Sequence, residues 1–273
     1  MRTRAMTPPA VLTVAGSDCS SGAGIQADLK TISALGGYAL TALTSVVSET
    51  PGRVSKVQLL EPDFIADQIR VLAGAFPILA AKTGMLGGRA QVEAVVQAWQ
   101  ESFPSTVPLV VDPVMVATGG GRLLAEDAID CMSRLLFPLA TLLTPNMDEA
   151  QVLWGRPVRT REEMTACATE LSARYGTGVL VKGGHLEGAT AADVLCRAGD
   201  CFWFESPRTS GVHTHGTGCT YSAAIASGLA LGRSLPDAVS RAKTFVSQAI
   251  QQHHAWSAGA GEVHALNHLQ QTS

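Results

Sequence analysis

The chain has 273 residues, of which 46% are apolar and 16% charged, with a formal net charge of −3. This length allows one large α/β domain or two small ones, and the charge argues against nucleic acid as the main partner. No apolar run approaches the roughly 20 residues that a membrane span needs. Residues 1–9 contain two arginines with no apolar core after them, so we predict a short disordered lead and not a signal peptide.

The six cysteines are scattered without C-x-x-C pairing, which argues against a zinc site and against a disulfide framework. Their number and spacing favour a reducing, cytoplasmic location. Cys196 and Cys201 flank an Arg-Ala-Gly-Asp stretch that is typical of a hairpin turn. We therefore expect structural cysteines on facing strands.

Short apolar runs alternate with helical patterns along most of the chain. The expected strands are 10–16, 38–47, 78–83, 109–112, 140–144 and 179–182, then a hairpin of 193–196 with 201–205. The expected helices are 25–35, 62–75, one ending near 102, 125–137, one starting near 145, one to 175 capped by Thr160 and Glu163, 221–231 and 234–252. We expect a loop at 48–53 and leave the tail from 256 unassigned.

This alternation predicts a single α/β domain over 10–273, with a doubly wound, mostly parallel central sheet and helices on both faces. In such a sheet, ligands bind outside the carboxyl ends of the strands. The residues expected there are acids, an amide, a lysine and glycines, which suit a phosphorylated ligand with a metal ion. They are Gly16, Asp18, Glu49, Gly84, Met85, Asp112, Thr144, Asn146 and Lys182.

A glycine-rich turn precedes the apolar run 221–231. Gly216 and Gly218 remove side-chain bulk, and a helix N-terminus behind them offers unpaired N–H groups and a favourable dipole to an anion. Cys219 is the unusual member, because helix N-termini lower thiol pKa values. This stretch by itself leaves two interpretations open: an anion site with a thiol as base or reactive group, or a plain cap on a buried helix.

Other phosphate-binding patterns are weak or absent. Gly22-Ala-Gly24-Ile-Gln-Ala27 fits G-x-G-x-x-A, but five residues separate it from Gly16, so a dinucleotide site is disfavoured. The sequence contains no P-loop, no protein-kinase motifs and no G-x-S-x-G elbow. Phosphoryl transfer without these loops still needs an anion hole, a cation and metal-binding acids. Lys182 is the candidate cation, and Asp112 and Glu149 are the candidate magnesium-associated acids.

Several motifs in a fixed order carry a family resemblance. They are residues 15–18 (Ala-Gly-Ser-Asp), 22–30 (Gly-Ala-Gly-Ile-Gln-Ala-Asp-Leu-Lys), 82–86 (Lys-Thr-Gly-Met-Leu), 112–115 (Asp-Pro-Val-Met), 144–146 (Thr-Pro-Asn) with Glu149, 182–185 (Lys-Gly-Gly-His) and 214–220 (Thr-His-Gly-Thr-Gly-Cys-Thr). From Val11 to about Ile250 the chain resembles the ribokinase-like superfamily. Within it, the chain resembles the hydroxymethylpyrimidine/phosphomethylpyrimidine kinases of thiamine biosynthesis.

The resemblance implies an ATP- and Mg²⁺-dependent enzyme and a homodimer. The glycine-rich loop at 116–122 is flexible enough to move, and we expect it to close over the site and exclude water. The implied catalytic residues are Cys219, Gly218, Gly216 and Lys182. The implied ATP-binding residues are Thr144, Asn146, Glu149, Lys182, Thr214 and Thr217, with Asp112 and Glu149 at the metal. The implied substrate-binding residues are Gly16, Asp28, Glu49, Met85 and Val114.

The substrate implied by the resemblance is 4-amino-5-hydroxymethyl-2-methylpyrimidine, phosphorylated to the monophosphate and then to the diphosphate. A carboxylate such as Asp28 pairs with the amine of an aminopyrimidine; without the resemblance, Asp28 is a polar residue on a helix's solvent face. One departure stands out: the pyrimidine kinases have Gln-Asn-Thr where this chain has Glu49-Thr50-Pro51, and an ionised carboxylate only accepts hydrogen bonds. The alternatives are a cysteine-type pyridoxal kinase and a non-catalytic vitamin-binding protein of the same fold.

Overall fold

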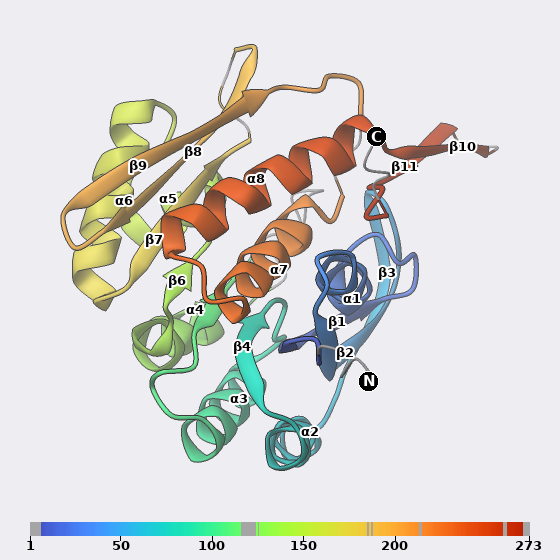
Figure 1. The fold of residues 1–273 in the computed structure, drawn as a ribbon, viewed down its shortest axis with the longest axis vertical. Helices are drawn as coiled ribbons and strands as arrows, with labels where there is room; N and C mark the ends of the chain where they lie inside the picture. The colour runs from blue at the N-terminus through green and yellow to red at the C-terminus, as the bar shows by residue number, and fades with distance from the viewer. Residues whose placement is uncertain are drawn as a thin grey trace, which may run out of the picture.

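A computed structural model describes residues 7–115, 124, 126–184, 186, 188–212, 215–258 and 261–269. Within these residues, nine strands form one sheet in the order β3-β2-β1-β4-β5-β6-β7-β8-β9 (Figure 1). The strands are β1 (Ala10–Asp18), β2 (Tyr38–Thr50), β3 (Arg53–Leu59), β4 (Ile78–Thr83), β5 (Leu109–Val111), β6 (Leu142–Leu143), β7 (Gly178–Gly183), β8 (Thr190–Arg197) and β9 (Asp200–Pro207).

The strands from β2 to β7 in this order are mutually parallel, whereas β3, β8 and β9 add antiparallel pairs at the two edges. The mostly parallel sheet is therefore confirmed. Parallel pairing brings the carboxyl ends of β1, β4, β5, β6 and β7 to one edge, where connecting loops gather the polar residues.

Helices cover both faces of the sheet, as predicted. Side chains alternate along each strand, so Val11 and Val110 join a core with one layer while Leu12 and Leu109 join the other. The first layer holds α1 (Gly24–Ala34), α7 (Thr217–Ala230) and α8 (Leu235–Gln251). The second holds α2 (Pro62–Ala75), α3 (Arg89–Ser102), α4 (Glu126–Cys131), α5 (Met147–Trp154) and α6 (Arg161–Tyr175). In the part of the chain that the structure describes, no helix combines the length and apolarity needed to cross a bilayer.

Three local expectations are corrected, and the tail that the sequence left unassigned is now described. β2 runs on to Thr50 and pairs with β3, so the loop expected at 48–53 is a turn around Gly52 (φ 82°). The helix expected at 125–137 becomes a π-helical segment at Met132–Leu136 and a 3-10 turn at Phe137–Leu139, where Pro138 cannot donate an N–H. β6 is only two residues long. The tail forms a hairpin of β10 (His254–Ala258) and β11 (Gly261–Ala265).

The hairpin of β8 and β9 places Cys196 directly opposite Cys201, which confirms facing strands. The two residues are joined by a disulfide, with their Cα atoms 4.2 Å apart. The expectation that no cysteines pair is therefore wrong for these two, because the tight turn between them brings their side chains into contact. Cys19, Cys131, Cys167 and Cys219 are free thiols.

Candidate active site

A pocket of about 720 Å³ lies along the carboxyl edge of the parallel strands. At one end it is lined by Glu49 and Val57 from β2 and β3, and at the other by Pro207 from β9 and Ile250 from α8. Because β3 and β9 are the two edges of the sheet, the pocket crosses the whole width of the sheet. A groove of this shape can hold two small molecules end to end.

Most of the predicted site residues line this pocket together. They are Gly16, Glu49, Met85, Asp112, Val114, Asn146, Glu149, Lys182, Gly216, Thr217, Gly218 and Cys219. Asp28 and Thr144 are buried outside its lining. Thr214 and the loop 116–122 lie outside the described residues.

The turn at residues 216–219, called the anion turn below, opens α7. Gly216 has φ 82°, and a Cβ there would lie 1.8 Å from the carbonyl oxygen of Gly22. A Cβ on Gly218 would lie 3.2 Å from Lys182 Nζ and 3.3 Å from Asp112 Oδ2. The glycines therefore let the backbone pack closely on one side and leave room beside Lys182 on the other, at the N-terminus of a helix. This arrangement fits an anion-binding site.

Lys182 and Asp112 form an ion pair at the pocket wall. Lys182 Nζ lies 2.9 Å from Asp112 Oδ1, and the Thr144 hydroxyl donates to the same oxygen at 3.2 Å. Burial alone would lower the pKa of Lys182, but the charges of Asp112 and Glu149 raise it above its ordinary value. Lys182 is therefore a fixed cation at neutral pH. Thr144 does not line the pocket but holds Asp112 by the hydrogen bond from its hydroxyl, and its expected contact with ATP stays a prediction.

Glu149 belongs to a helix cap. Its Oε2 accepts from the Asn146 N–H at 2.9 Å, the Asn146 side chain accepts from the Glu149 N–H, and its Oε1 accepts from the Met115 N–H at 3.1 Å. Burial raises the pKa of Glu149, and Lys182 opposes that shift. The Met115 contact ties α5 to the segment after β5, where Val114 has φ 42°, a rare conformation for a β-branched residue. Glu149 thus shapes the pocket wall, and both its oxygens are engaged by backbone donors.

Asp18 joins the loop after β1 to the start of α7. Its Oδ2 accepts from the N–H groups of Gly22 and Ala23 at 3.0 and 2.8 Å, and its Oδ1 from the Ser20 N–H at 2.7 Å. His215 Nε2 lies 3.2 Å from Oδ2. Burial alone would raise the pKa of Asp18, but these hydrogen bonds lower it to about 2. Asp18 was predicted at a strand end with no role of its own. An acid followed by Cys-Ser-Ser-Gly is a turn signal that could have revealed it.

We expect the Asp18 carboxylate to stabilise the fold in a pH-dependent way. Its folded-state pKa of about 2 lies below the ordinary 3.8, so its contribution is complete above about pH 4 and is lost as the pH falls through 2. The shift corresponds to about 2 kcal/mol. Asp18→Asn should lower the free energy of unfolding by about that amount at pH 7 and by much less at pH 2.5, in urea titrations.

The exposed Asp67→Asn on α2 is the matched control and should change little at either pH. An equal loss for Asp18→Asn at both pH values would contradict the electrostatic role.

Glu49 lies beside Asp18 and His215. Burial raises the pKa of Glu49, the Asp18 charge raises it further, and His215 opposes the shift. One ligand atom from each of the three residues lies within 4.8 Å of the others, a spacing that could hold a metal ion. Because the Asp18 oxygens already accept several hydrogen bonds, we interpret the trio as support for the loop after β1.

Cys219 lies in the first turn of α7. Burial raises the pKa of its thiol to about 11, Lys82 opposes the shift, and Asp28 adds to it. The expectation of a lowered thiol pKa is therefore wrong, because desolvation outweighs the helix N-terminus. At neutral pH Cys219 is an S–H group at the anion turn.

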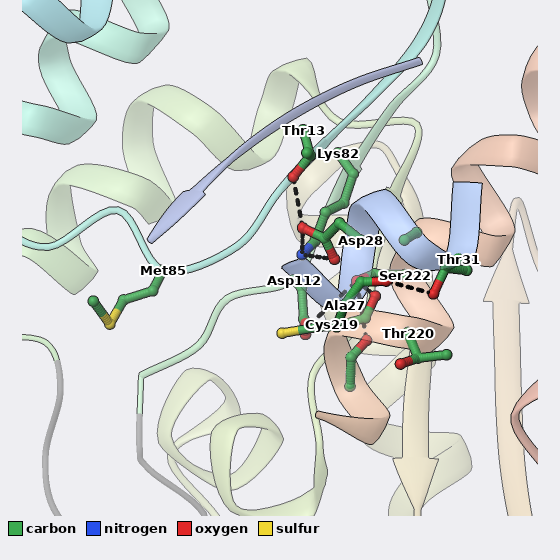
Figure 2. Close-up of polar contacts among 12 residues, drawn as sticks. Thr13, Ala27, Asp28, Thr31, Lys82, Met85, Asp112, Cys219, Thr220 and Ser222 are labelled. Atoms are coloured by element: carbon green, nitrogen blue, oxygen red, sulfur yellow. Dashed lines mark hydrogen bonds and ion pairs between the residues drawn. The ribbon is translucent and has the colours of Figure 1, made fainter. Parts of the chain in front are cut away.

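Asp28 does not line the pocket, and its expected role in substrate binding stays a prediction. It is fully buried in α1, both of its oxygens lie 2.9 Å from Lys82 Nζ, and the Thr13 hydroxyl donates to Oδ2 at 2.6 Å (Figure 2). The solvent-exposed alternative is wrong, because α1 packs against α7 on this side. Sequence reasoning missed Lys82 as a partner, although a lysine at the end of an apolar strand is itself a signal.

Comparisons with known proteins agree with this geometry. The family model described as phosphomethylpyrimidine kinase matches residues 18–264. A hydroxymethylpyrimidine/phosphomethylpyrimidine kinase of Mycobacterium tuberculosis is 41% identical over 97% of this chain and 96% of its own. The thiamine biosynthesis bifunctional protein ThiED of Geobacter sulfurreducens is 41% identical over 95% of this chain, which spans 52% of that longer relative.

A solved structure of pyridoxal kinase from Staphylococcus aureus, in complex with AMP-PCP and pyridoxal, is similar with a TM-score of 0.85 and 33% identity. The similarity covers 96% of this chain and 94% of that one. The ribokinase-like fold expected from the motifs is thus confirmed. With a family model matched over most of its length and full-length relatives above 40% identity, the chain belongs to the phosphomethylpyrimidine kinase family.

Proposed function

We propose that this chain uses ATP to phosphorylate 4-amino-5-hydroxymethyl-2-methylpyrimidine to its monophosphate, and the monophosphate to the diphosphate, in thiamine biosynthesis. The observation that carries the proposal is the anion turn facing the Lys182–Asp112 pair inside one elongated pocket. Membership of the phosphomethylpyrimidine kinase family supports the same activity. The cytoplasmic location and the homodimer stay predictions.

The pocket suggests where each substrate lies. Gly16, Glu49, Met85 and Val114 line the end near β2, which we assign to the pyrimidine. ATP would occupy the other end, with its phosphates near Asn146, Glu149, Lys182 and Thr217. The similar pyridoxal kinase was solved with AMP-PCP, which supports nucleotide use in this fold.

In the proposed reaction, the hydroxymethyl oxygen forms a bond to the γ-phosphorus as the bond to the β,γ-bridging oxygen breaks and ADP leaves. Backbone N–H groups of the anion turn, the Cys219 thiol and the Lys182 ammonium stabilise the charge on the transferred group. The transition state of phosphoryl transfer is loose, so the hydroxyl proton leaves late, to an oxygen of the phosphoryl group that is being transferred. A protonated Cys219 in the resting enzyme is compatible with this order of events.

ATP is used as a magnesium complex, and Asp112 is the residue that best fits that ion. Mg²⁺ prefers oxygen ligands and keeps several waters. Asp112 Oδ1 is engaged by Lys182 and Thr144, whereas its Oδ2 accepts only a long hydrogen bond of 3.5 Å from the Ser222 hydroxyl and lies on the side of the anion turn. Glu149 fits a direct ligand less well, because backbone N–H groups engage both its oxygens. We propose that Glu149 contributes negative charge and that Asp112 contacts the hydrated ion.

The decisive experiment compares kcat/KM for the pyrimidine alcohol and for pyridoxal, with product masses checked for mono- and diphosphate. We expect the pyrimidine to be the better substrate by at least about tenfold, because a site built for hydrogen bonds discriminates strongly between ligands. Pyridoxal kinase is the second candidate, favoured by the likeness to the Staphylococcus aureus enzyme and by Glu49 in place of the family glutamine. Turnover of either alcohol would exclude a non-catalytic vitamin-binding protein.

The variant Glu49→Gln also tests whether the pyrimidine alcohol or pyridoxal is the preferred substrate. An amide both donates and accepts hydrogen bonds, so we expect this variant to keep or improve pyrimidine kcat/KM. Glu49→Leu removes both functions and should lower it. A variant Glu49→Gln that gained on pyridoxal and lost the pyrimidine would contradict the assignment of this pocket end.

A further inference from the structure

A fully buried ion pair joins α1 and β4, two elements that pack against α7. The Lys82 and Asp28 side chains are 0% exposed, and Lys82 Nζ lies 2.9 Å from each Asp28 oxygen. The Thr13 hydroxyl holds Asp28 from the other side at 2.6 Å. A buried ion pair is weak evidence for stability, because its desolvation costs about as much as the attraction returns. We therefore look for a role of this ion pair other than stabilising the core.

The two elements that carry the ion pair both pack against α7, the helix that begins at the anion turn. Lys82 lies on β4 and Asp28 on α1 (Figure 2). The backbone leaves room for the ammonium, since a Cβ on Gly84 would lie 3.0 Å from Lys82 Nζ. Among the charged groups around Cys219, Lys82 has the largest effect on its thiol pKa and lowers it, while Asp28 and Asp112 raise it. Asp112 is itself neutralised by Lys182.

We infer that Lys82, held in place by Asp28, supplies a positive electrostatic potential at the anion turn that favours the anionic phosphoryl group during transfer. Lys82 touches no ligand, so it is a positioning residue that acts through space. In a buried site, a charge a few ångströms away has a far larger effect than it has in water. The catalytic consequence rests on the proposed kinase function, whereas the potential itself can be measured without any substrate.

The Cys219 thiol is a probe of this potential. Iodoacetate and iodoacetamide alkylate the same thiolate, so the ratio of their rates reports the local potential independently of the thiolate fraction. The measurement uses a Cys19→Ser background, because Cys19 is exposed, and follows modification of Cys219 by peptide mass. We expect Lys82→Met to lower the iodoacetate-to-iodoacetamide ratio about tenfold.

The variant Asp28→Asn is compared with Lys82→Met, because it removes the other charge of the pair. It breaks the same ion pair but leaves the ammonium, so we expect the ratio to rise. The double variant Lys82→Met/Asp28→Asn leaves no unpaired charge in the core, and it should lower the ratio even if Lys82→Met folds poorly. Thr31→Val, which removes a buried hydroxyl one turn along α1, is the matched control and should leave the ratio unchanged.

Turnover gives the second measurement. Lys82→Met should lower kcat at least about tenfold and leave KM for the pyrimidine alcohol unchanged, since Lys82 does not line the pocket. A ratio that stays constant, or that falls equally in Lys82→Met and Asp28→Asn, would overturn the inference and indicate a purely structural pair. If the unaltered protein fails to phosphorylate the pyrimidine, the proposed function fails, but the alkylation ratios still decide the inference.

Discussion

Cys219→Ala is expected to lower kcat for the pyrimidine alcohol by about 10²- to 10³-fold, with the fold intact. The thiol lies in the first turn of α7, where charge develops on the transferred phosphoryl group, and removing one such donor has an effect of about this size. Steady-state kinetics with ATP and the pyrimidine alcohol would measure the loss. KM should change little, because the thiol acts on the transferred group and not on the pyrimidine ring.

A second cysteine provides the control for that experiment. Cys167 is buried on α6, away from the pocket, so Cys167→Ala removes the same atoms without touching the site. Its kcat should equal that of the unaltered protein. If kcat of Cys219→Ala lay within threefold of that of the unaltered protein, Cys219 would not be a catalytic residue.

Lys182→Met is expected to impair the use of ATP more than Cys219→Ala does. We expect kcat/KM for ATP to fall by about 10³-fold. The ammonium sits beside the anion turn and neutralises Asp112, so its loss leaves the Asp112 and Glu149 carboxylates to repel the phosphates. We therefore expect both a lower kcat and a higher KM for ATP. Initial rates over a range of ATP concentrations at fixed Mg²⁺ would separate the two.

Lys56→Met serves as the control, since Lys56 is exposed on β3 and does not line the pocket. If KM for ATP in Lys182→Met matched that of the unaltered protein, Lys182 would not be the cation that binds the ATP phosphates.

The parts of the fold that depend on local pattern were predictable from the sequence. The central strands appear as short apolar runs because both faces of a parallel sheet are buried. The capping box of Thr160 and Glu163 was predicted from its spacing and is confirmed. Gly216, Gly218 and Cys219 were expected at a helix start for the same reason, and α7 begins at Thr217, four residues before the expected helix at 221–231.

The parts that depend on distant partners were not predictable. Every residue of β3 is exposed, so its sequence carries no burial pattern, and pairing with β2 alone makes it a strand. Asp28 and Lys82 are 54 residues apart, and nothing local distinguishes Asp28 from a solvated acid. The thiol pKa of Cys219 also depends on burial by surrounding elements, which outweighs the local helix start. Family resemblance pointed to motifs that line the pocket, but it gave no sign of the ion pair between Asp28 and Lys82.

The close approach of Gly216 to the Gly22 carbonyl has a consequence for how the protein is made. The loop after β1 is synthesised almost 200 residues before the turn that packs against it, and His215 contacts Asp18 across the same gap. Contacts this distant in sequence form late and slowly during folding. A nascent chain that has not yet exposed α7 outside the ribosome can therefore form its early strands but no working site. Chains that stop before α7 should accumulate without activity, with the surface that α7 would cover left open to aggregation or proteolysis.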